Sequence, residues 1–490
     1  MDTAVSFFSG LLDRAPGDKR EESTSVSASA SSTSYGSDEG PKRSRLRKWF
    51  LSEEPAGPLE APDRFAYMEN AKYLLIAAVV WRNAIEDFLS TAVVVNAESL
   101  SVRRTKLDIL EPALPWIRAL YLTLGAFSMP LFIAICGFQS KSWFEIARGD
   151  DALASTMLAR VRQSTGSLIG AWVLWQALYC VLEYAETRPL QWWAPIDVTW
   201  FLLALWIWRN SVLLFGGMRD GVIYAVVCGL AIAVGFTDTP TTANGLVFLD
   251  WQRVCTYSLY FYSGALLVQR EHLDYVMKSL KYTLKPWVRF ALGVIGLGVA
   301  YFGFMLADHL GESFAEVSEW LFAAAPYGFT EWYHPFREAF MRVLLYIIVA
   351  FCSAAFMCLV PTDEWFFTPL GSRTLTAYLL HRLFITIYFK LTTKFWDDDD
   401  IDVVTQIVMG VFVLPLVVSQ ATLSRPVSML FAPLVDPAAA LSGVVAWMFV
   451  GGDSSWPSTS AVDAADEAAM EVVPEKWMQA ASDADERVDA

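Results

Sequence analysis

Long runs of apolar residues alternate with short polar joints along most of the chain. A helix needs about 20 mostly apolar residues to cross about 30 Å of hydrocarbon. A transmembrane β-barrel would instead show segments of about 10 residues that alternate between apolar and polar. The continuous runs therefore predict an all-α fold, a polytopic transmembrane helical bundle of about ten spans. The expected spans are about 71–92, 113–138, 166–185, 198–216, 221–237, 252–270, 287–308, 338–360, 370–392 and 402–421.

Polar and small residues dominate both ends of the chain. Residues 1–63 are rich in Ser, Gly, Pro and charge, and residues 453–490 are acidic with few bulky side chains. Both segments are predicted to be disordered tails, because they cannot bury enough apolar surface to fold. The transmembrane domain is expected over 64–425, followed by a short apolar interfacial segment at 426–452.

Composition supports the membrane class. Apolar residues make up 55% of the chain and charged residues 18%, with a mean hydropathy of +0.37. Soluble domains carry about 25% charged residues. The net charge of −15 lies largely in the C-terminal tail and in Asp397–Asp400, and no basic surface indicates nucleic-acid binding. The six cysteines fall in apolar runs without metal-ligand spacing, which is typical of small buried residues.

The distribution of basic residues predicts the orientation. Lys and Arg are enriched in cytosolic joints between spans. With the N-terminus inside, the cytosolic joints contain Lys141, Arg148, Arg160, Arg162, Arg270, Lys278, Lys281 and Lys285. Arg103, Arg104 and Lys106 oppose this assignment. The balance places both termini in the cytosol and leaves open whether the membrane is an endomembrane or the plasma membrane.

The first span carries four polar residues at membrane depth: Arg82, Asn83, Glu86 and Asp87. Ionisable groups are costly there and are functional candidates by default. Helical spacing puts Asn83, Glu86 and Asp87 on one face, and Arg82 lies four residues before Glu86. The same residues could serve only to hold the bundle together through an ion pair. Both interpretations stay open from the residues alone.

Two further groups of residues are candidates for a site. His381 lies inside the ninth expected span, where a buried histidine is either a packed core residue or a proton carrier. Arg160 and Arg162 precede the third span and are either anchors at the cytosolic edge or ligands for the phosphates of a cytosolic donor. The four histidines are scattered, so no metal site is expected.

Four segments resemble the acyltransferase-3 superfamily, in particular its fucose 4-O-acetylase-like branch. The segment 69–83 reads ENAKYLLIAAVVWRN, like the family's acidic-Asn-x-Lys start of a long apolar run. The segment 129–138 reads MPLFIAICGF, 200–205 reads WFLLAL, and 374–381 reads TLTAYLLH, each similar to a motif of the family. The segments keep the family's order and span about 64–425.

The resemblance implies O-acyl transfer from cytosolic acetyl-CoA, or another acyl-CoA, to a small hydroxylated acceptor such as a sugar. The acyl-CoA would be a cosubstrate, with no tightly bound cofactor, and the other partners would be membrane lipids. By the resemblance, Lys72, Arg160 and Arg162 would contact the donor. His381, Glu86 or Asp87 would handle the proton, and Asn83 would bond the acceptor or the developing oxyanion.

One departure from the family affects its chemistry. The family's first-span histidine is Asn83 here, and an amide cannot take up a proton near neutral pH. Either another residue has taken over as base, or the chain is a catalytically degenerate member that acts as a transporter, binder or scaffold. A secondary transporter of unrelated fold is a third possibility.

Overall fold

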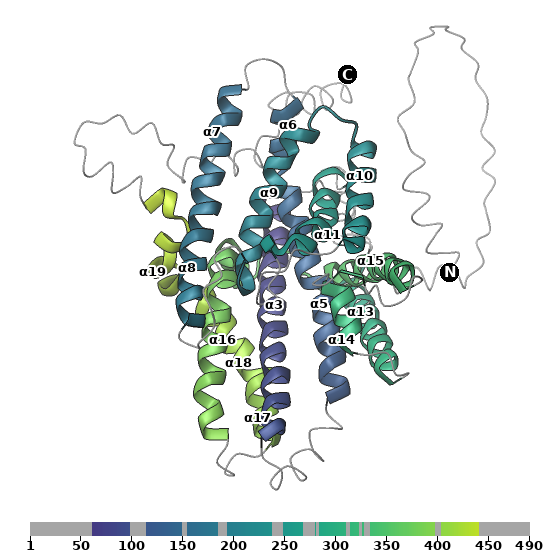
Figure 1. Cartoon of the computed structure of the whole chain (residues 1–490), viewed down its shortest axis with the longest axis vertical. Helices are drawn as coiled ribbons and strands as arrows, with labels where there is room; N and C mark the ends of the chain where they lie inside the picture. Colours follow the sequence, from purple (N-terminus) through teal and green to yellow (C-terminus); the bar gives the residue numbers. More distant parts are fainter. Residues whose placement is uncertain are drawn as a thin grey trace, which may run out of the picture. The chain divides into compact units, whose positions relative to one another are not determined.

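The protein is described by a computed structural model that covers residues 61–98, 114–148, 154–184, 194–237, 248–267, 280, 284–309, 314–322, 326–327, 334–396 and 403–440. Every secondary-structure element in these ranges is a helix, as the apolar runs predict. Helix α3 (Ala61–Glu98) runs through the middle of the bundle, between α5 (Leu114–Gln139) and α16 (Thr374–Trp396), and packs against both (Figure 1).

A helix occupies each of the ten ranges predicted to be spans. Besides α3, α5 and α16, these are α7 (Ala154–Ser164) continuing through η1 (Thr165–Ile169) into α8 (Gly170–Tyr184), α9 (Trp200–Phe215), α10 (Asp220–Ala233), α11 (Trp251–Tyr262), α13 (Pro286–His309), α15 (His334–Leu359), and α17 (Val403–Ile407) continuing through η8 (Val408–Val413) into α18 (Leu414–Leu423).

Within the described residues, six helical stretches are long and apolar enough to cross a membrane. They are Leu114–Arg148, Met157–Leu182, Asp197–Phe215, Pro286–His309, Pro335–Leu359 and Val404–Leu423. The chain is therefore an integral membrane protein with several spans. Helices α3 and α16 are also long, but charged side chains interrupt their apolar sequence inside the bundle.

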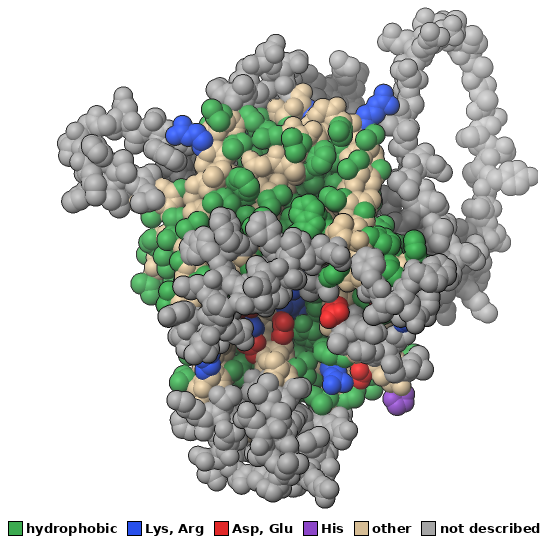
Figure 2. Space-filling view, viewed as in Figure 1, with side chains coloured by type: hydrophobic (Ala, Val, Ile, Leu, Met, Phe, Trp, Pro, Cys, Tyr) green, Lys and Arg blue, Asp and Glu red, His purple; other side chains and the backbone are tan. Residues whose placement is uncertain are grey.

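The outward faces of α13 and α15 are apolar, as expected of helices that face lipid. Phe302 of α13 is 66% exposed and Phe340 of α15 is 67% exposed. Figure 2 shows hydrophobic side chains over most of the described surface, with a few acidic and basic side chains visible at its middle. Such exposed apolar surface would be unfavourable in water and is satisfied by hydrocarbon.

Glycines allow two helices to approach closely near the centre. A Cβ on Gly137 of α5 would collide with the carbonyl oxygen of Phe261, and a Cβ on Gly264 would collide with that of Ala134. Gly264 belongs to η5 (Ser263–Leu267), a π-helical turn that continues α11. Small residues at such crossings let helix backbones pack against each other in membranes.

The chain is irregular just before α9. Asp197 begins a short 3₁₀ turn, η2 (Asp197–Thr199), and has a left-handed φ of 47°. The buried Gln176 of α8 satisfies the hydrogen bonds of this backbone. Its side-chain nitrogen Nε2 donates to the Ala194 carbonyl at 2.7 Å, and its Oε1 accepts from the Ile196 amide at 3.1 Å. Irregular backbone at membrane depth is tolerated only when protein groups or water satisfy it.

Two smaller helices lie outside the ten predicted spans. Helix α14 (Phe314–Phe322) packs against α5 and α15. The expected interfacial segment 426–452 coincides in part with α19 (Arg425–Val435), in which no residue is buried. Of the expected tails, 453–490 and nearly all of 1–63 lie outside the described residues, and α3 begins at Ala61, three residues before the expected domain boundary.

Candidate functional site

The centre of the candidate site is a direct contact between α3 and α16. The side-chain nitrogen Nδ2 of Asn83 lies 2.6 Å from Nε2 of His381. The other ring nitrogen of His381, Nδ1, lies 3.1 Å from the carbonyl oxygen of Ala377 and donates its proton there. Nε2 is then the accepting nitrogen and receives a hydrogen bond from Asn83. His381 is fully buried and Asn83 is 6% exposed.

Arg82 supports Asn83 from the other side. Its Nη2 donates to Asn83 Oδ1 at 2.7 Å and to Glu86 Oε2 at 2.8 Å, so the predicted ion pair between Arg82 and Glu86 is confirmed. The guanidinium lies over the ring of Phe322 of α14, with Cζ 4.7 Å from the ring centroid. A charged donor on its oxygen polarises the Asn83 amide and strengthens the hydrogen bond that it gives to His381.

Arg382, the residue after His381, joins three elements. Its Nη1 donates to Asp87 Oδ1 of α3 at 2.6 Å. Its Nε forms an ion pair with Asp197 Oδ2 of η2 at 3.1 Å. The side chains of Arg382 and Asp87 are 17% and 14% exposed, whereas that of Asp197 is 37% exposed. The second acidic candidate of α3 is thus engaged by an arginine, as Glu86 is by Arg82.

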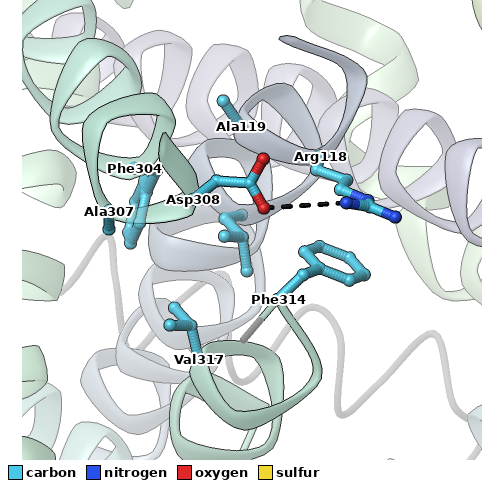
Figure 3. Close-up of a pocket in the computed structure, with 8 residues that line it drawn as sticks. Arg118, Ala119, Phe304, Ala307, Asp308, Phe314 and Val317 are labelled. Carbon is cyan, nitrogen blue, oxygen red and sulfur yellow. Dashed lines mark ion pairs between the residues drawn. The ribbon is translucent and has the colours of Figure 1, made fainter. Parts of the chain in front are cut away.

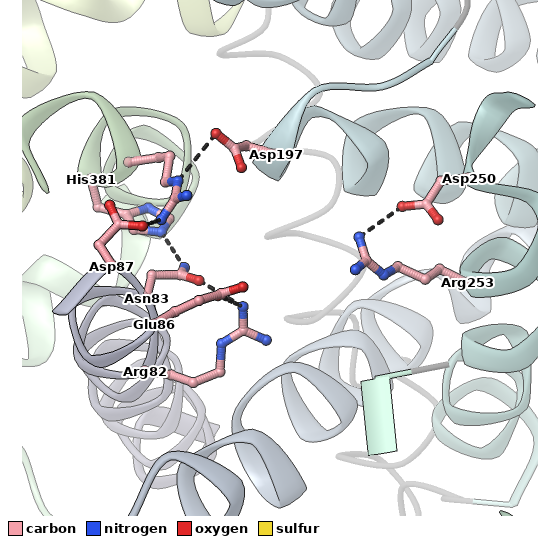
Figure 4. Close-up of polar contacts among 9 residues, drawn as sticks. Arg82, Asn83, Glu86, Asp87, Asp197, Asp250, Arg253 and His381 are labelled. Carbon is pink, nitrogen blue, oxygen red and sulfur yellow. Dashed lines mark hydrogen bonds and ion pairs between the residues drawn. The ribbon is translucent and has the colours of Figure 1, made fainter. Parts of the chain in front are cut away.

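A second acid–base pair faces the first from α11. Arg253 Nη1 bonds Asp250 Oδ2 at 2.9 Å, and Asp250, like Asp197, has a left-handed φ. Figure 4 shows this pair across the view from Arg82, Glu86 and Asp197. Non-glycine residues in this conformation cost roughly 1 kcal/mol and concentrate at functional sites. Seven charged side chains, together with Asn83 and His381, make up a group that we call the polar centre. Its members are Arg82, Asn83, Glu86, Asp87, Asp197, Asp250, Arg253, His381 and Arg382.

Aromatic side chains form one wall beside the polar centre. Phe132 of α5, Phe201 of α9 and Tyr378 of α16 pack together, with ring centroids 5.7 Å apart for Phe132 and Phe201 and 5.1 Å for Phe201 and Tyr378. Tyr378 also contacts His381, at 5.8 Å between ring centroids. Each of the four segments singled out in the sequence, on α3, α5, α9 and α16, contributes a residue to this one region.

The proposed donor-binding residues lie near a different part of the bundle. Lys72 precedes Asn83 by eleven residues, which is about 16 Å along the helix axis. It pairs with Glu69 at 2.5 Å, beside Gly371 of the turn before α16. Arg160 donates to Ser142 at 2.7 Å, next to Ser140, which receives a bond from Arg209 at 3.2 Å.

These contacts bring Arg160 and Arg209 together at the corner between α5 and α6 (Lys141–Arg148). Lys72 and Arg209 both act electrostatically on Cys136, at the end of the matched segment of α5. Arg162 is exposed on α7. The polar centre and this basic corner are therefore separate groups, and His381 joins Asn83, Glu86 and Asp87 but not Lys72, Arg160 or Arg162.

Sequence reasoning missed Arg382 as a member of the site, together with Asp250 and Arg253. Asp197 was not among the candidates either. The signal for Arg382 was present, because it is an ionisable residue inside an expected span, the same property that singled out Arg82. Nothing in the sequence pairs Arg382 with Asp87 or Asp197, since these partners are 295 and 185 residues away.

A small hollow lies where α5, α13 and α14 meet. Figure 3 shows Arg118 of α5 and Asp308 of α13 at this hollow, 3.7 Å apart as an ion pair, with Phe304 and Phe314 beside them. Tyr121, which lies under Arg82, contacts both Phe314 and Phe322. One aromatic layer thus separates the hollow from the polar centre.

Within the part of the chain that the structure describes, no group of three or more His, Cys, Asp or Glu side chains is arranged to hold a metal ion. The chain matches no family model, no curated protein and no solved structure.

Proposed function

We propose that this protein is a membrane O-acyltransferase of about ten spans that moves an acyl group from acyl-CoA to a hydroxylated acceptor such as a sugar. The observation that carries the proposal is the bond between Asn83 and His381, which orients a buried imidazole with Nε2 as its accepting nitrogen. The contact forms where all four segments that resemble the acyltransferase-3 superfamily come together, which supports the resemblance without depending on any one motif.

His381 is the general base in this proposal. Nε2 takes the proton of the acceptor hydroxyl while the hydroxyl oxygen attacks the carbonyl carbon of the thioester. The carbon–sulfur bond then breaks, and the coenzyme A thiolate takes the proton back from the imidazolium. Asn83 Nδ2 must turn from Nε2 toward the carbonyl oxygen, where an amide donor polarised by Arg82 stabilises the developing negative charge.

The donor enters from the basic corner in this proposal. Lys72, Arg160 and Arg162 bind the phosphates of acyl-CoA on the cytosolic side, and its extended thioester arm reaches about 16 Å along α3 to Asn83. The basic side chains of this corner favour the cytosol, which agrees with both termini being cytosolic. Reporter tags at the two termini test this orientation in sealed vesicles whose cytosolic face points outward. A tag that resists a protease added outside the vesicles would contradict it.

A second candidate is a catalytically degenerate member that binds or transports a polar solute. One observation favours it: Asn83 stands where the family has histidine, and its amide occupies the nitrogen of His381 that would act as base. The paired acids and arginines of the polar centre would then bind the solute. Flux of solute across liposomes without release of coenzyme A would support this candidate.

The deciding experiment measures thiol release and acyl transfer by the purified full-length protein with labelled acetyl-CoA and a panel of monosaccharide and polyol acceptors. We expect acceptor-dependent thiol release that falls by about 100-fold or more in His381→Ala, because general base catalysis contributes about that much. His309→Ala is the matched control, since His309 is an exposed histidine at the end of α13.

Two results would reject acyl transfer: no turnover by the wild-type protein with any acceptor, or turnover that is equal in His381→Ala and His309→Ala. Asn83→His distinguishes a catalytically degenerate protein from an active acyltransferase. Acetyl-CoA turnover that appears only in this variant would show that the natural chain has lost the reaction while it keeps the surrounding site.

A further inference from the structure

The ion pairs of Arg382 link the segment before α9 to the contact between Asn83 and His381. Arg382 follows His381 directly on α16, so its ion pairs hold the same helical turn that carries the imidazole. One of its arms reaches Asp87, one turn after Asn83 on α3. The other arm reaches Asp197, on the irregular segment that Gln176 also holds.

The two arms differ in geometry and in burial. The arm to Asp87 is 2.6 Å long and joins two side chains less than one-fifth exposed. The arm to Asp197 is an ion pair of 3.1 Å in which Arg382 Nε lacks hydrogen-bond geometry, and it ends on a side chain that is more than one-third exposed. A guanidinium can serve two carboxylates at once because its nitrogens point in fixed, different directions, which the single ammonium of lysine cannot reproduce.

Asp197 is held in an unfavourable backbone conformation at this junction. Its φ of 47° is rare for a residue with a side chain and must be stabilised by its surroundings. Gln176 fixes the residues on either side, at Ala194, Ile196 and Thr199, and Arg382 fixes the side chain of Asp197 itself. The segment is therefore fixed in place by α8 and α16 together.

We propose that Arg382 is a positioning residue: by binding Asp87 and Asp197 at once, it fixes α16 against α3 and η2 and thereby sets the contact between His381 and Asn83. Arg382 touches neither nitrogen of the imidazole, so its effect on the site is indirect. The role rests on the proposed function only for its catalytic consequence; the geometric claim stands independently of any reaction.

The chain offers a direct spectroscopic test because it contains only four histidines. Full-length protein labelled with ¹⁵N-histidine gives ring nitrogen resonances that report which nitrogen is bonded, and His381→Gln assigns those of His381. We expect Arg382→Gln to displace the His381 ring resonances while those of His309 and His334 stay in place. Arg382→Lys should restore them only in part.

Arg118→Gln is the matched control, because it also removes an arginine that pairs with an acid on another helix, Asp308 of α13, outside the polar centre. It should leave the His381 resonances unchanged. If Arg382→Gln does not fold, Asp197→Asn breaks only the more exposed arm and should displace the same resonances by a smaller amount. Wild-type His381 resonances in both Arg382→Gln and Asp197→Asn would overturn the proposal.

Activity separates this proposal from the proposed function. In an active protein, Arg382→Gln should lower kcat by about 100-fold, the effect of a misplacement of about 1 Å. The KM for acetyl-CoA should change little, since Lys72, a proposed donor ligand, lies about 16 Å from Asn83 along α3. Absence of acyl transfer in the wild type rejects the proposed function but leaves the resonance test valid. An unchanged kcat in an active Arg382→Gln protein rejects the positioning role.

Discussion

Asn83 donates a 2.6 Å hydrogen bond to His381 across 298 residues of sequence, and Arg82 bonds the oxygen of the same amide at 2.7 Å. The amide therefore connects a cation to an imidazole and leaves neither buried group unpaired. A side chain that bonds two partners inside the bundle is difficult to replace. Its loss leaves a donor and an acceptor there without a hydrogen bond, which is costly away from water.

Asn83→Leu should lower stability by about 2 kcal/mol or more, since it deprives both Arg82 and His381 of a partner. The midpoint of thermal unfolding in a fixed detergent, followed by tryptophan fluorescence, measures the change. Asn210→Leu is the control, because among the described residues Asn210 bonds only Trp206, on its own helix. Equal midpoints for the two variants would contradict the bridging role of Asn83.

The two acids that bind Arg382 should not contribute equally. Asp87→Asn breaks the more buried of the two pairs and should cost about 3 kcal/mol. Asp197→Asn breaks the more exposed arm and should cost at most about 1 kcal/mol. Chemical or thermal unfolding of both variants under one set of conditions compares them. A larger loss in Asp197→Asn than in Asp87→Asn would reverse the order that their burial predicts.

The close crossing of α5 and η5 should be sensitive to a single methyl group. Gly264→Ala places a Cβ against the Ala134 carbonyl oxygen and should separate the two backbones, with a cost of about 1–3 kcal/mol. Gly298→Ala is the matched control: it lies in α13, and a Cβ there meets nothing within 4 Å. That change should be neutral or slightly stabilising, because alanine favours a helix more than glycine does. Similar unfolding midpoints for both variants would argue against the close approach.

The irregular segment before α9 should depend on Gln176. Gln176→Leu removes the partners of the Ala194 carbonyl, the Ile196 amide and the Thr199 hydroxyl, and should cost at least about 2 kcal/mol. Proteolysis between α8 and α9 in detergent should also become faster. Gln420→Leu serves as the control, since Gln420 is exposed and bonds only the Tyr73 hydroxyl among the described contacts. No difference in cleavage between the two would exclude a fixing role for Gln176.

The helical class and the places of the long helices were predictable from the sequence, because hydrocarbon thickness imposes a length on each apolar run. The ion pair between Arg82 and Glu86 was predictable for a similar reason, since it depends only on helical spacing. The exact number of spans stays a prediction, because α10 and α11 are short and α3 and α16 carry charges.

The composition of the polar centre depends on contacts between distant parts of the chain. Asn83 and His381 could each be singled out as polar residues in apolar runs, but their contact follows from the packing of α3 against α16. The pairing of Arg382 with Asp197 also requires the irregular turn at η2, which Gln176 supports from a third helix. Local periodicity carries no information about such partners.

The pairing between Asp87 and Arg382 has a consequence for how the protein is made. Arg82 finds Glu86 on its own helix as soon as α3 forms, but Asp87 must wait for α16, which is translated 295 residues later. At roughly 5–20 residues per second, that delay is about 15–60 s. During this time the nascent α3 carries a carboxyl group that lacks its arginine partner. Early release of this helix into lipid should therefore be slow, and completion of α16 becomes the step that commits the chain to its folded bundle.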